Sequence, residues 1–266
     1  MHKNDLLHTF QVDCLTIRVF GTKLAMGAAA AAQAAATLAQ AIRRRNRARV
    51  VIATGPSQDE VIDSLVALPG VDWSRTEVFH MDEYVGISDS HPASFRRWLR
   101  TRVVDRVHPQ ETHYLHGDAD DLAGECSRYA ALLNSSPIDL CFVGFGENGH
   151  IAFNDPHTAD FEDPLTVKRV SLDEVCRRQQ VGEGHFPNVG VVPAEAITLS
   201  CRALMAAEVL ICCVPDRRKA KAVRRTLDGT ISPECPASLV RRHPRASLYL
   251  DIESASLVET PVGQPQ

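Results

Sequence analysis

A glycine-rich loop, residues 144–156 with the sequence GFGENGHIAFNDP, carries the side chains best suited to chemistry. It places an imidazole, His150, five residues before a carboxylate, Asp155, and both groups can accept and release protons. The loop follows the apolar run 138–143, which is typical of a buried strand. Ligands of open α/β sheets bind beyond the carboxyl ends of the strands, so we expect this loop to line a site. Taken alone, the pattern fits equally well a connector with a surface histidine.

A second predicted strand, 50–53, runs into Thr54, Gly55, Pro56 and Ser57 and then into a helical pattern. Free N–H groups at a helix N-terminus, together with hydroxyl groups, favour an anion. The simpler alternative is that Ser57 only caps the helix. The GxxxxGK[ST] pattern of a nucleotide-binding P-loop is absent.

A third predicted strand, 76–81, ends at the adjacent carboxylates Asp82 and Glu83. Acidic residues are poor strand formers in an interior position. One of them is a candidate general base, and the other is expected to form a structural hydrogen bond or ion pair. An ordinary polar turn is the alternative, but three strands that each end in such residues favour one shared site.

The histidines do not predict a metal site. His150, Asp155 and His157 are close in sequence, but no periodic element aims them at a common point, as zinc ligands require. His80, Asp82 and His91 form a separate group, and the cysteines show no CxxC pairing. We therefore expect no metal. A serine hydrolase is also disfavoured because no GxSxG motif is present.

The elements that must position these residues alternate between strands and helices, which predicts an α/β fold with a single-domain, Rossmann-like, mainly parallel sheet flanked by helices. The predicted strands are Leu15–Phe20, Val50–Ala53, Thr76–Met81, Ile138–Val143, Val209–Val214 and Ser247–Ile252. The predicted helices are Leu24–Arg45, Ser57–Leu68, Pro92–Val104, Asp121–Leu133 and Arg217–Leu227. We place the domain at 1–257 and a frayed tail at 258–266.

Composition limits the partners. A net charge of −4 and a pI near 6.3 give no reason to expect nucleic acid or an anionic membrane. No signal peptide and no membrane-spanning stretch are predicted. Eight cysteines without a disulfide-like pattern fit the reducing cytoplasm. The basic cluster 43–49 is interpreted as a solvated helix end, and a homo-oligomer stays possible.

At these motifs the chain resembles the glucosamine-6-phosphate deaminase family, in the wider group that includes 6-phosphogluconolactonases. The matching pieces are TGPS at 54–57, MDEYVG at 81–86, HPASF at 91–95 and DLCFVGFGENGHIAFNDP at 139–156. Weaker matches are LDEVCR at 172–177, VPAEAIT at 192–198 and RKA at 218–220. The resemblance implies a reaction without a cofactor, in which glucosamine 6-phosphate and water give fructose 6-phosphate and ammonia.

The resemblance also implies roles. Asp82 would move a proton between C2 and C1 of the open-chain sugar. His150 would assist ring opening, oriented by the carboxylate of Asp155 and by Asn148. The phosphate ligands and the other binding residues would be Thr54, Gly55, Ser57, Glu83, Gly149, Arg177 and Lys219, with Arg178 as the alternative to Arg177.

Two departures leave the substrate open. Many members have Asp at the position of Asn148 and Glu at the position of Asp155. Because Asp is one methylene shorter than Glu, the reach of Asp155 to His150 is shorter by about 1.5 Å. The segment LDEVCRRQQVGEGHF, 172–186, also differs from typical deaminases. The rivals are a 6-phospho-sugar lactonase on the same fold and a sugar-phosphate sensor without turnover. The sequence NGHIAFND favours the deaminase over the lactonase.

Overall fold

The computed structural model describes residues 5–259 and places eight strands in one mainly parallel sheet, ordered β1-β2-β11-β10-β7-β3-β4-β6. Only the β1–β2 pairing is antiparallel; the others in this sheet are parallel. The strands are β1 Leu6–Val12, β2 Leu15–Phe20, β3 Ala48–Ile52, β4 Thr76–His80, β6 Glu111–His113, β7 Leu140–Val143, β10 Leu210–Val214 and β11 Ala246–Asp251. The predicted fold class is confirmed.

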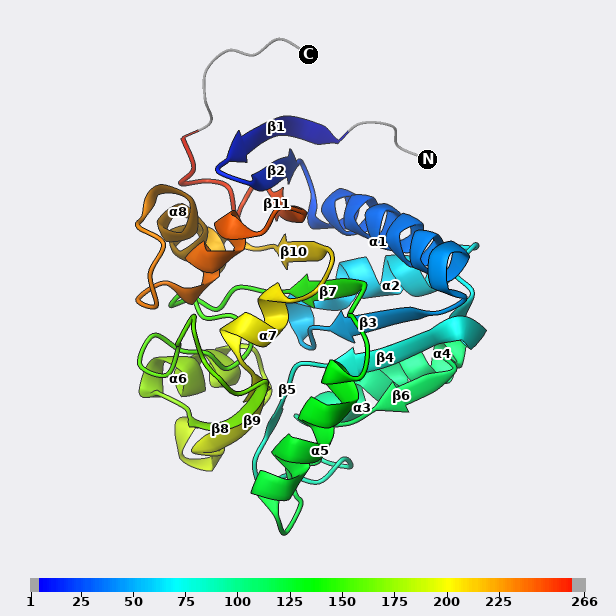
Figure 1. The fold of residues 1–266 in the computed structure, drawn as a ribbon. Helices are drawn as coiled ribbons and strands as arrows, with labels where there is room; N and C mark the ends of the chain where they lie inside the picture. Colours follow the sequence, from blue (N-terminus) through cyan, green and yellow to red (C-terminus); the bar gives the residue numbers. More distant parts are fainter. Residues whose placement is uncertain (1–4, 260–266) are drawn as a thin grey trace.

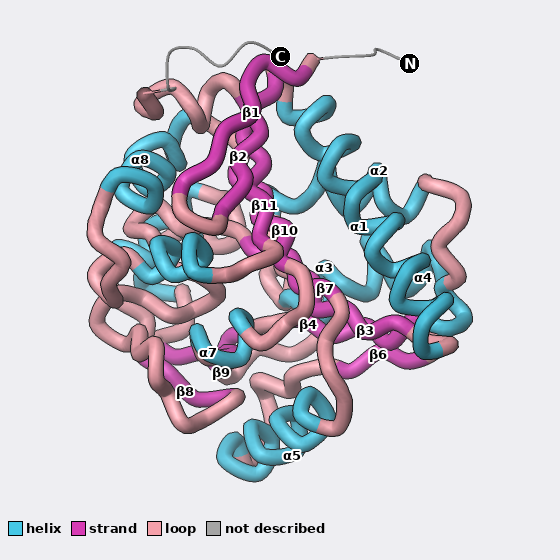
Figure 2. The backbone as a smooth tube through the Cα atoms, turned by 45° about the horizontal axis from the view of Figure 1, so that its top comes forward, coloured by secondary structure: helices cyan, strands magenta, loops and turns pink. Residues whose placement is uncertain are grey.

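Helices cover both faces of this sheet. In Figure 2, α1, α2 and α4 lie on one side, and α5 and α7 lie on the other. The helices are α1 Lys23–Arg45, α2 Asp59–Ala67, α3 Phe95–Leu99, α4 Asp105–Val107, α5 Leu122–Asn134, α6 Glu174–Gly182, α7 Cys201–Met205 and α8 Ala220–Asp228.

Helix α1 shows why the alanine-rich segment is helical. The side chain of Thr22 caps its first turn by accepting a hydrogen bond from the N–H of Ala25, and Asn46 ends it in the left-handed conformation with φ 59°. Its small buried residues, such as Ala30 and Ala34, let it lie close against the sheet and α2. By length and composition alone it could cross a membrane, in contrast to the sequence expectation, but one face is packed inside the molecule.

A second, small antiparallel sheet lies beyond the carboxyl ends of the main strands (Figure 1). It has the order β5-β9-β8 and consists of β5 Asp82–Tyr84, β9 Glu195–Leu199 and β8 Val167–Ser171. Its own aromatic core centres on Tyr84, whose ring centroid lies 5.0 Å from that of Phe95 and 5.2 Å from those of Phe153 and Phe186. This core holds β5 and α6 in place beside the main sheet.

Several sequence expectations need correction. The predicted helix 92–104 begins only at Phe95 as α3, continues as a π-helical turn at Arg100–Val104 and runs beyond its predicted end into α4. The basic cluster at the end of α1 is not merely solvated, because Arg44 and Arg45 both pair with Glu208. The prediction missed β1, β6, the second sheet, α6 and α7. Of the predicted frayed tail 258–266, residues 260–266 lie outside the described residues.

Candidate active site

A cavity opens where four neighbouring parallel strands end. It is lined by residues that follow β3, β4, β7 and β10, together with α6 and the turn after it. Asp82, His150 and Lys219 all line it, although they are far apart in the sequence. Parallel strands in adjacent positions deliver their following loops to one edge, so the three sequence motifs meet as predicted. The cavity volume is about 70 Å³.

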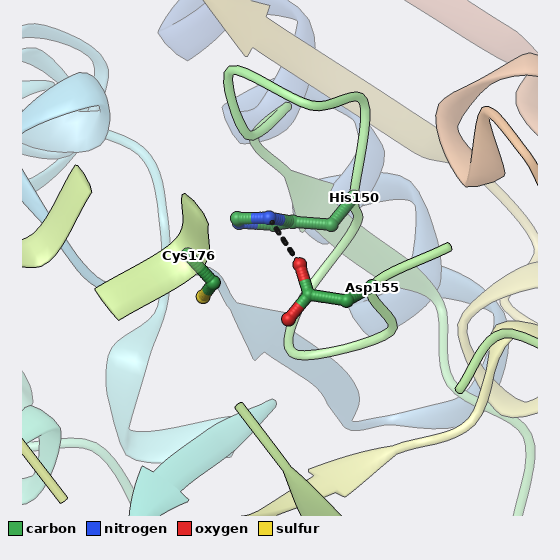
Figure 3. A group of neighbouring side chains, drawn as sticks. All are labelled: His150, Asp155 and Cys176. Carbon is green, nitrogen blue, oxygen red and sulfur yellow. Dashed lines mark ion pairs between the residues drawn. The ribbon is translucent and has the colours of Figure 1, made fainter. Parts of the chain in front are cut away.

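The imidazole of His150, which lines the cavity, pairs with the carboxylate of Asp155 (Figure 3). Its Nδ1 lies 3.0 Å from Oδ1 of Asp155, so the shorter carboxylate does reach the imidazole. Burial alone would raise the pKa of Asp155, but the hydrogen bond and charge of His150 bring it below its usual value. Because Nδ1 faces the carboxylate, Nε2 is the nitrogen left for a substrate.

Asn148 connects both members of this pair. Its Nδ2 donates to Oδ1 of Asp155 at 2.9 Å, and its Oδ1 accepts the backbone N–H of His150 at 3.0 Å. The side chain therefore orients the pair by hydrogen bonds and adds no charge.

Two glycines of the loop are required by its geometry. A Cβ at Gly146 would lie 2.2 Å from Cε1 of His150, so only glycine leaves room for the imidazole. Gly149 has φ +89°, and a Cβ there would lie 2.7 Å from Sγ of Cys235. Gly149 was predicted to bind substrate, but it does not line the cavity and instead forms the turn that carries His150.

Asp82 projects from the first position of β5. Its carboxylate accepts no hydrogen bond from the described residues and is largely buried. Burial, and then the neighbouring charge of Glu83, raise the pKa of Asp82 well above its usual range. A carboxylate that is poorly solvated and unpaired is a stronger base than one in water.

His80 fixes the backbone at this point. Its Nδ1 lies 2.9 Å from the carbonyl oxygen of Asp82, and its Nε2 accepts the N–H of Leu115 at 2.9 Å. Burial lowers the pKa of His80 to about 3, so the ring is neutral at physiological pH. His80 is thus a structural residue that positions Asp82.

Glu83 has a structural role that differs from the predicted binding role. Its carboxylate accepts the backbone N–H groups of Tyr84, Phe95 and Arg96 and the hydroxyl of Ser94, at 2.8–3.2 Å. Those donors come largely from the start of α3, and Glu83 does not line the cavity. Its oxygens are therefore already occupied. One carboxylate of the DE pair is free and the other is structural, as the sequence suggested.

One end of the cavity is suited to an anion. Thr54, Gly55 and Ser57 line it, and Oγ1 of Thr54 is buried without a hydrogen-bond partner among the described residues. Ser57 lies in the turn Pro56–Gln58, before α2 begins at Asp59, and its side chain does not cap that helix. The capping alternative is therefore wrong.

Lys219 supplies the positive charge at this end. It is almost fully buried, which lowers its pKa, and its Nζ lies 3.4 Å from Oε1 of Glu183. Arg218 also pairs with Glu183, at 3.4 Å. An acidic side chain thus lies beside the cation that the sequence assigned to a phosphate.

Neither arginine proposed as a phosphate ligand reaches the cavity. Nη2 of Arg177 donates to the carbonyl oxygens of Val189 and Val192, at 2.7 and 2.9 Å. Arg178 pairs with Glu174 on the surface, and its side chain is 69% exposed. In this structure, neither Arg177 nor Arg178 is therefore placed to bind a phosphate in the cavity.

Four residues of α6 and the following turn line the cavity but were not predicted. They are Gln179, Gln180, Glu183 and His185. In the sequence, this segment differs from typical deaminases but shows no binding motif. The sequence did offer one signal, since Asp173 caps α6 by accepting a hydrogen bond from the N–H of Cys176 at 2.6 Å, a common helix start.

Cys176 is the further residue that the sequence reading left out. Its sulfur lies near the His150–Asp155 pair, and the ligand atoms of the three residues all fall within 4.8 Å of one another. Burial, and then the charge of Asp155, raise the pKa of the Cys176 thiol. His157, which the sequence grouped with His150, belongs to a separate group with Asp155 and Asp173.

Comparison with known proteins places this geometry in context. Residues 21–249 match the family described as glucosamine-6-phosphate isomerases/6-phosphogluconolactonase. A glucosamine-6-phosphate deaminase from Bacillus cereus strain B4264 is 35% identical over 187 residues, which is 70% of each chain. One from Pseudarthrobacter chlorophenolicus is 34% identical over 231 residues, covering 85% of this chain and 87% of the relative.

Solved structures agree in fold. A monomeric glucosamine-6-phosphate deaminase superposes with a TM-score of 0.82 at 28% identity and covers 91% of this chain and 99% of its own. A 6-phosphogluconolactonase from Shewanella baltica gives a TM-score of 0.74 at 18% identity, covering 91% and 98%. The second likeness concerns the fold alone.

Proposed function

The chain belongs to the family of glucosamine-6-phosphate isomerases and 6-phosphogluconolactonases, and we propose that it converts glucosamine 6-phosphate, or a close amino sugar 6-phosphate, and water to fructose 6-phosphate and ammonia. The observation that carries this proposal is one cavity lined by an unpaired carboxylate, Asp82, by the imidazole of the His150–Asp155 pair, and by Lys219. Two proton-transfer groups and one cation are the minimum that this reaction needs.

The first step is the opening of the sugar ring. Nε2 of His150 takes the proton of the C1 hydroxyl and delivers it to the ring oxygen as the bond between C1 and that oxygen breaks. The pairing of Nδ1 with Asp155 keeps Nε2 as the nitrogen that is free to accept the proton. Asn148 holds both partners by hydrogen bonds.

The second step is the isomerisation. Asp82 removes the proton from C2 of the open-chain aldehyde while the aldehyde oxygen gains a proton, which gives an enolamine. Asp82 then delivers a proton to C1 and the amino group loses one, so that the C2–N bond becomes an imine. Water then adds to C2, and ammonia leaves with formation of the C2 ketone. The carboxylate is suited to this exchange because it is desolvated and accepts no hydrogen bond from the described residues. No step requires a cofactor.

The phosphate binds between Lys219 and the hydroxyl groups of Thr54 and Ser57. A cavity of about 70 Å³ holds about two waters, whereas ligand sites are typically about 300–1,000 Å³. Glu183 must therefore move away from Lys219 when the phosphate binds, because the carboxylate and the phosphate compete for one cation.

The test is the release of ammonia from a panel of amino sugar phosphates, with glucosamine as the control that lacks the phosphate. We expect turnover of one phosphorylated amino sugar, and calorimetry should show that glucosamine binds very poorly. Equal binding of both sugars would contradict the phosphate assignment. Hydrolysis of 6-phosphogluconolactone without ammonia release would favour the lactonase, and tight binding without either reaction would favour a sensor.

The remaining assignments are also proposals. We infer that the enzyme works in the cytoplasm, where its substrate class is metabolised and where its cysteines, all free among the described residues, stay reduced. The chain is a candidate homo-oligomer, although one structurally similar deaminase is described as monomeric. Sedimentation of the purified protein decides this point.

A further inference from the structure

A nitrogen, an oxygen and a sulfur ligand converge behind the cavity. His150 and Asp155 come from the loop after β7, and Cys176 comes from α6 (Figure 3). Their ligand atoms lie within 4.8 Å of one another. All three residues are buried, so the group is held by the core and is not a chance meeting on the surface.

One carboxylate oxygen of Asp155 is free to bind a ligand. Its side chain is 0% exposed, and Oδ2 accepts no hydrogen bond from any described residue. A buried carboxylate oxygen without a partner is costly, and binding of a cation removes that cost.

We propose that His150, Asp155 and Cys176 bind a soft divalent cation, Zn²⁺ or Cd²⁺, and that this cation inhibits the enzyme. Imidazole, carboxylate and thiolate are the ligand types of zinc sites, and three protein ligands leave one position for water. On binding, the thiol proton of Cys176 is released to solvent and its sulfur coordinates the cation as a thiolate.

Inhibition follows from the position of the site, and this part rests on the proposed function. A cation that coordinates the His150 ring disrupts its 3.0 Å pairing with Asp155. The coordinated ring is then no longer held in the orientation that proton transfer to the sugar ring requires, so that ring opening fails. The cation is therefore an inhibitor and has no part in turnover.

A neighbouring group offers an internal comparison. Asp155, His157 and Asp173 also lie within 4.8 Å of one another, but His157 is exposed and the group has no thiol. A cation bound there would leave Cys176 unchanged. Substitution of His157 therefore separates the two sites.

The decisive experiment is a Cd²⁺ titration of the chelator-treated full chain, followed by the ultraviolet charge-transfer band of the cadmium–thiolate bond. We expect the band to saturate at one equivalent in the wild type, in Cys14→Ala and in His157→Ala. Cys14 is the matched control because its thiol is exposed. Cys176→Ala should lose the band and weaken binding by at least about 100-fold, since even indirect ligand partners contribute about 10- to 100-fold.

A band that persists in Cys176→Ala, or that disappears in Cys14→Ala, would overturn the assignment. Absence of binding in a wild type whose circular dichroism is native would overturn it as well. Circular dichroism of Cys176→Ala, and of Cys176→Ser if the first variant is unfolded, verifies that loss of the band is not loss of the fold.

Activity forms the second arm. Zn²⁺ should reduce ammonia release in proportion to the fraction of sites that it occupies, and EDTA should restore the activity. At the same Zn²⁺ concentration, Cys176→Ala should keep most of its own metal-free rate. If the cadmium band behaves as expected and no ammonia is released by any metal-free protein, the proposed function fails and the cation site stands. If metal-free activity is normal and Cd²⁺ does not bind, the cation site is refuted and the proposed function stands.

Discussion

Replacement of Asp82 by Asn should make the protein more stable and nearly inactive. Asn has the size of Asp but is neutral and cannot accept a proton. A positioned proton transfer contributes about 10²–10⁴ in rate, so turnover should fall by at least that factor, or about 3–5.5 kcal/mol of activation free energy. Substrate binding should persist, because the anion end of the cavity is unchanged.

The gain in stability follows from the pKa of Asp82, which burial and the charge of Glu83 raise in the folded protein. At low pH the Asp82 carboxyl is protonated in both the folded and the unfolded protein, so it does not change the free energy of unfolding. As the pH rises, the unfolded chain ionises first, so the folded state loses stability until the pH passes the raised pKa. Each tenfold change in the acid dissociation constant corresponds to about 1.4 kcal/mol, and each kcal/mol to roughly 2–4 °C in Tm at this chain size.

The assays are thermal unfolding of both proteins from pH 4 to pH 8, ammonia release, and the entry of solvent deuterium at C1 of the product. The Tm of Asp82→Asn should exceed that of the wild type by a margin that widens as the pH rises. Deuterium should enter C1 with the wild type only. A margin independent of pH would refute the electrostatic reasoning, and equal deuterium incorporation would dismiss Asp82 as the base.

Four further outcomes are expected. His150→Gln should lose about 10²–10⁴ in the release of ammonia from the cyclic amino sugar phosphate but much less in the exchange of solvent deuterium into C1 of the ketose in the presence of ammonia, because that exchange needs no opening of the amino sugar ring; equal losses would contradict the role of His150. Glu183→Gln should lower the KM of the phosphorylated substrate roughly three- to tenfold, about 0.6–1.4 kcal/mol, because the competitor for Lys219 is weakened; an unchanged or higher KM would show that Glu183 does not compete. Glu83→Gln should lower the free energy of unfolding by about 2–3 kcal/mol, since its amide would face N–H and O–H donors, and should change the KM less than tenfold; a large rise in KM in a stable protein would restore the binding role. Exhaustive chelation should leave ammonia release intact, and loss of activity restored by added metal would turn His150 and Asp155 into ligands of a catalytic ion.

The sequence predicted the elements whose pattern is local. Strand β2 coincides with the predicted run 15–20, and β10 differs from its prediction by one residue. Buried parallel strands read as continuous apolar runs, which makes them easy to find. The second sheet escaped because β5 has only three residues and begins with two carboxylates, and its strand character depends on pairing with β9.

The site was predictable where function depends on the end of a strand, and not where it depends on side-chain direction. Asp82 and His150 follow apolar strands and reach the cavity as expected. Arg177 lies on α6, where a rotation of one residue decides between cavity, core and solvent. The hydrogen-bond partners of Arg177 and Arg178 therefore could not be predicted from the sequence, and neither could the proximity of Cys176 to Asp155.

The order of the sheet has a consequence for biosynthesis. Strand β2, made near the start of the chain, gains its parallel partner only when β11 emerges, since Thr16 pairs with Ser247. Until then the β1–β2 hairpin has an open edge, and an open edge can pair with another chain. Closure over so long a separation is slow. A ribosome that stalls before β11 therefore leaves a nascent chain prone to aggregation, and deletion of β11 should be far more damaging than deletion of the residues that follow it.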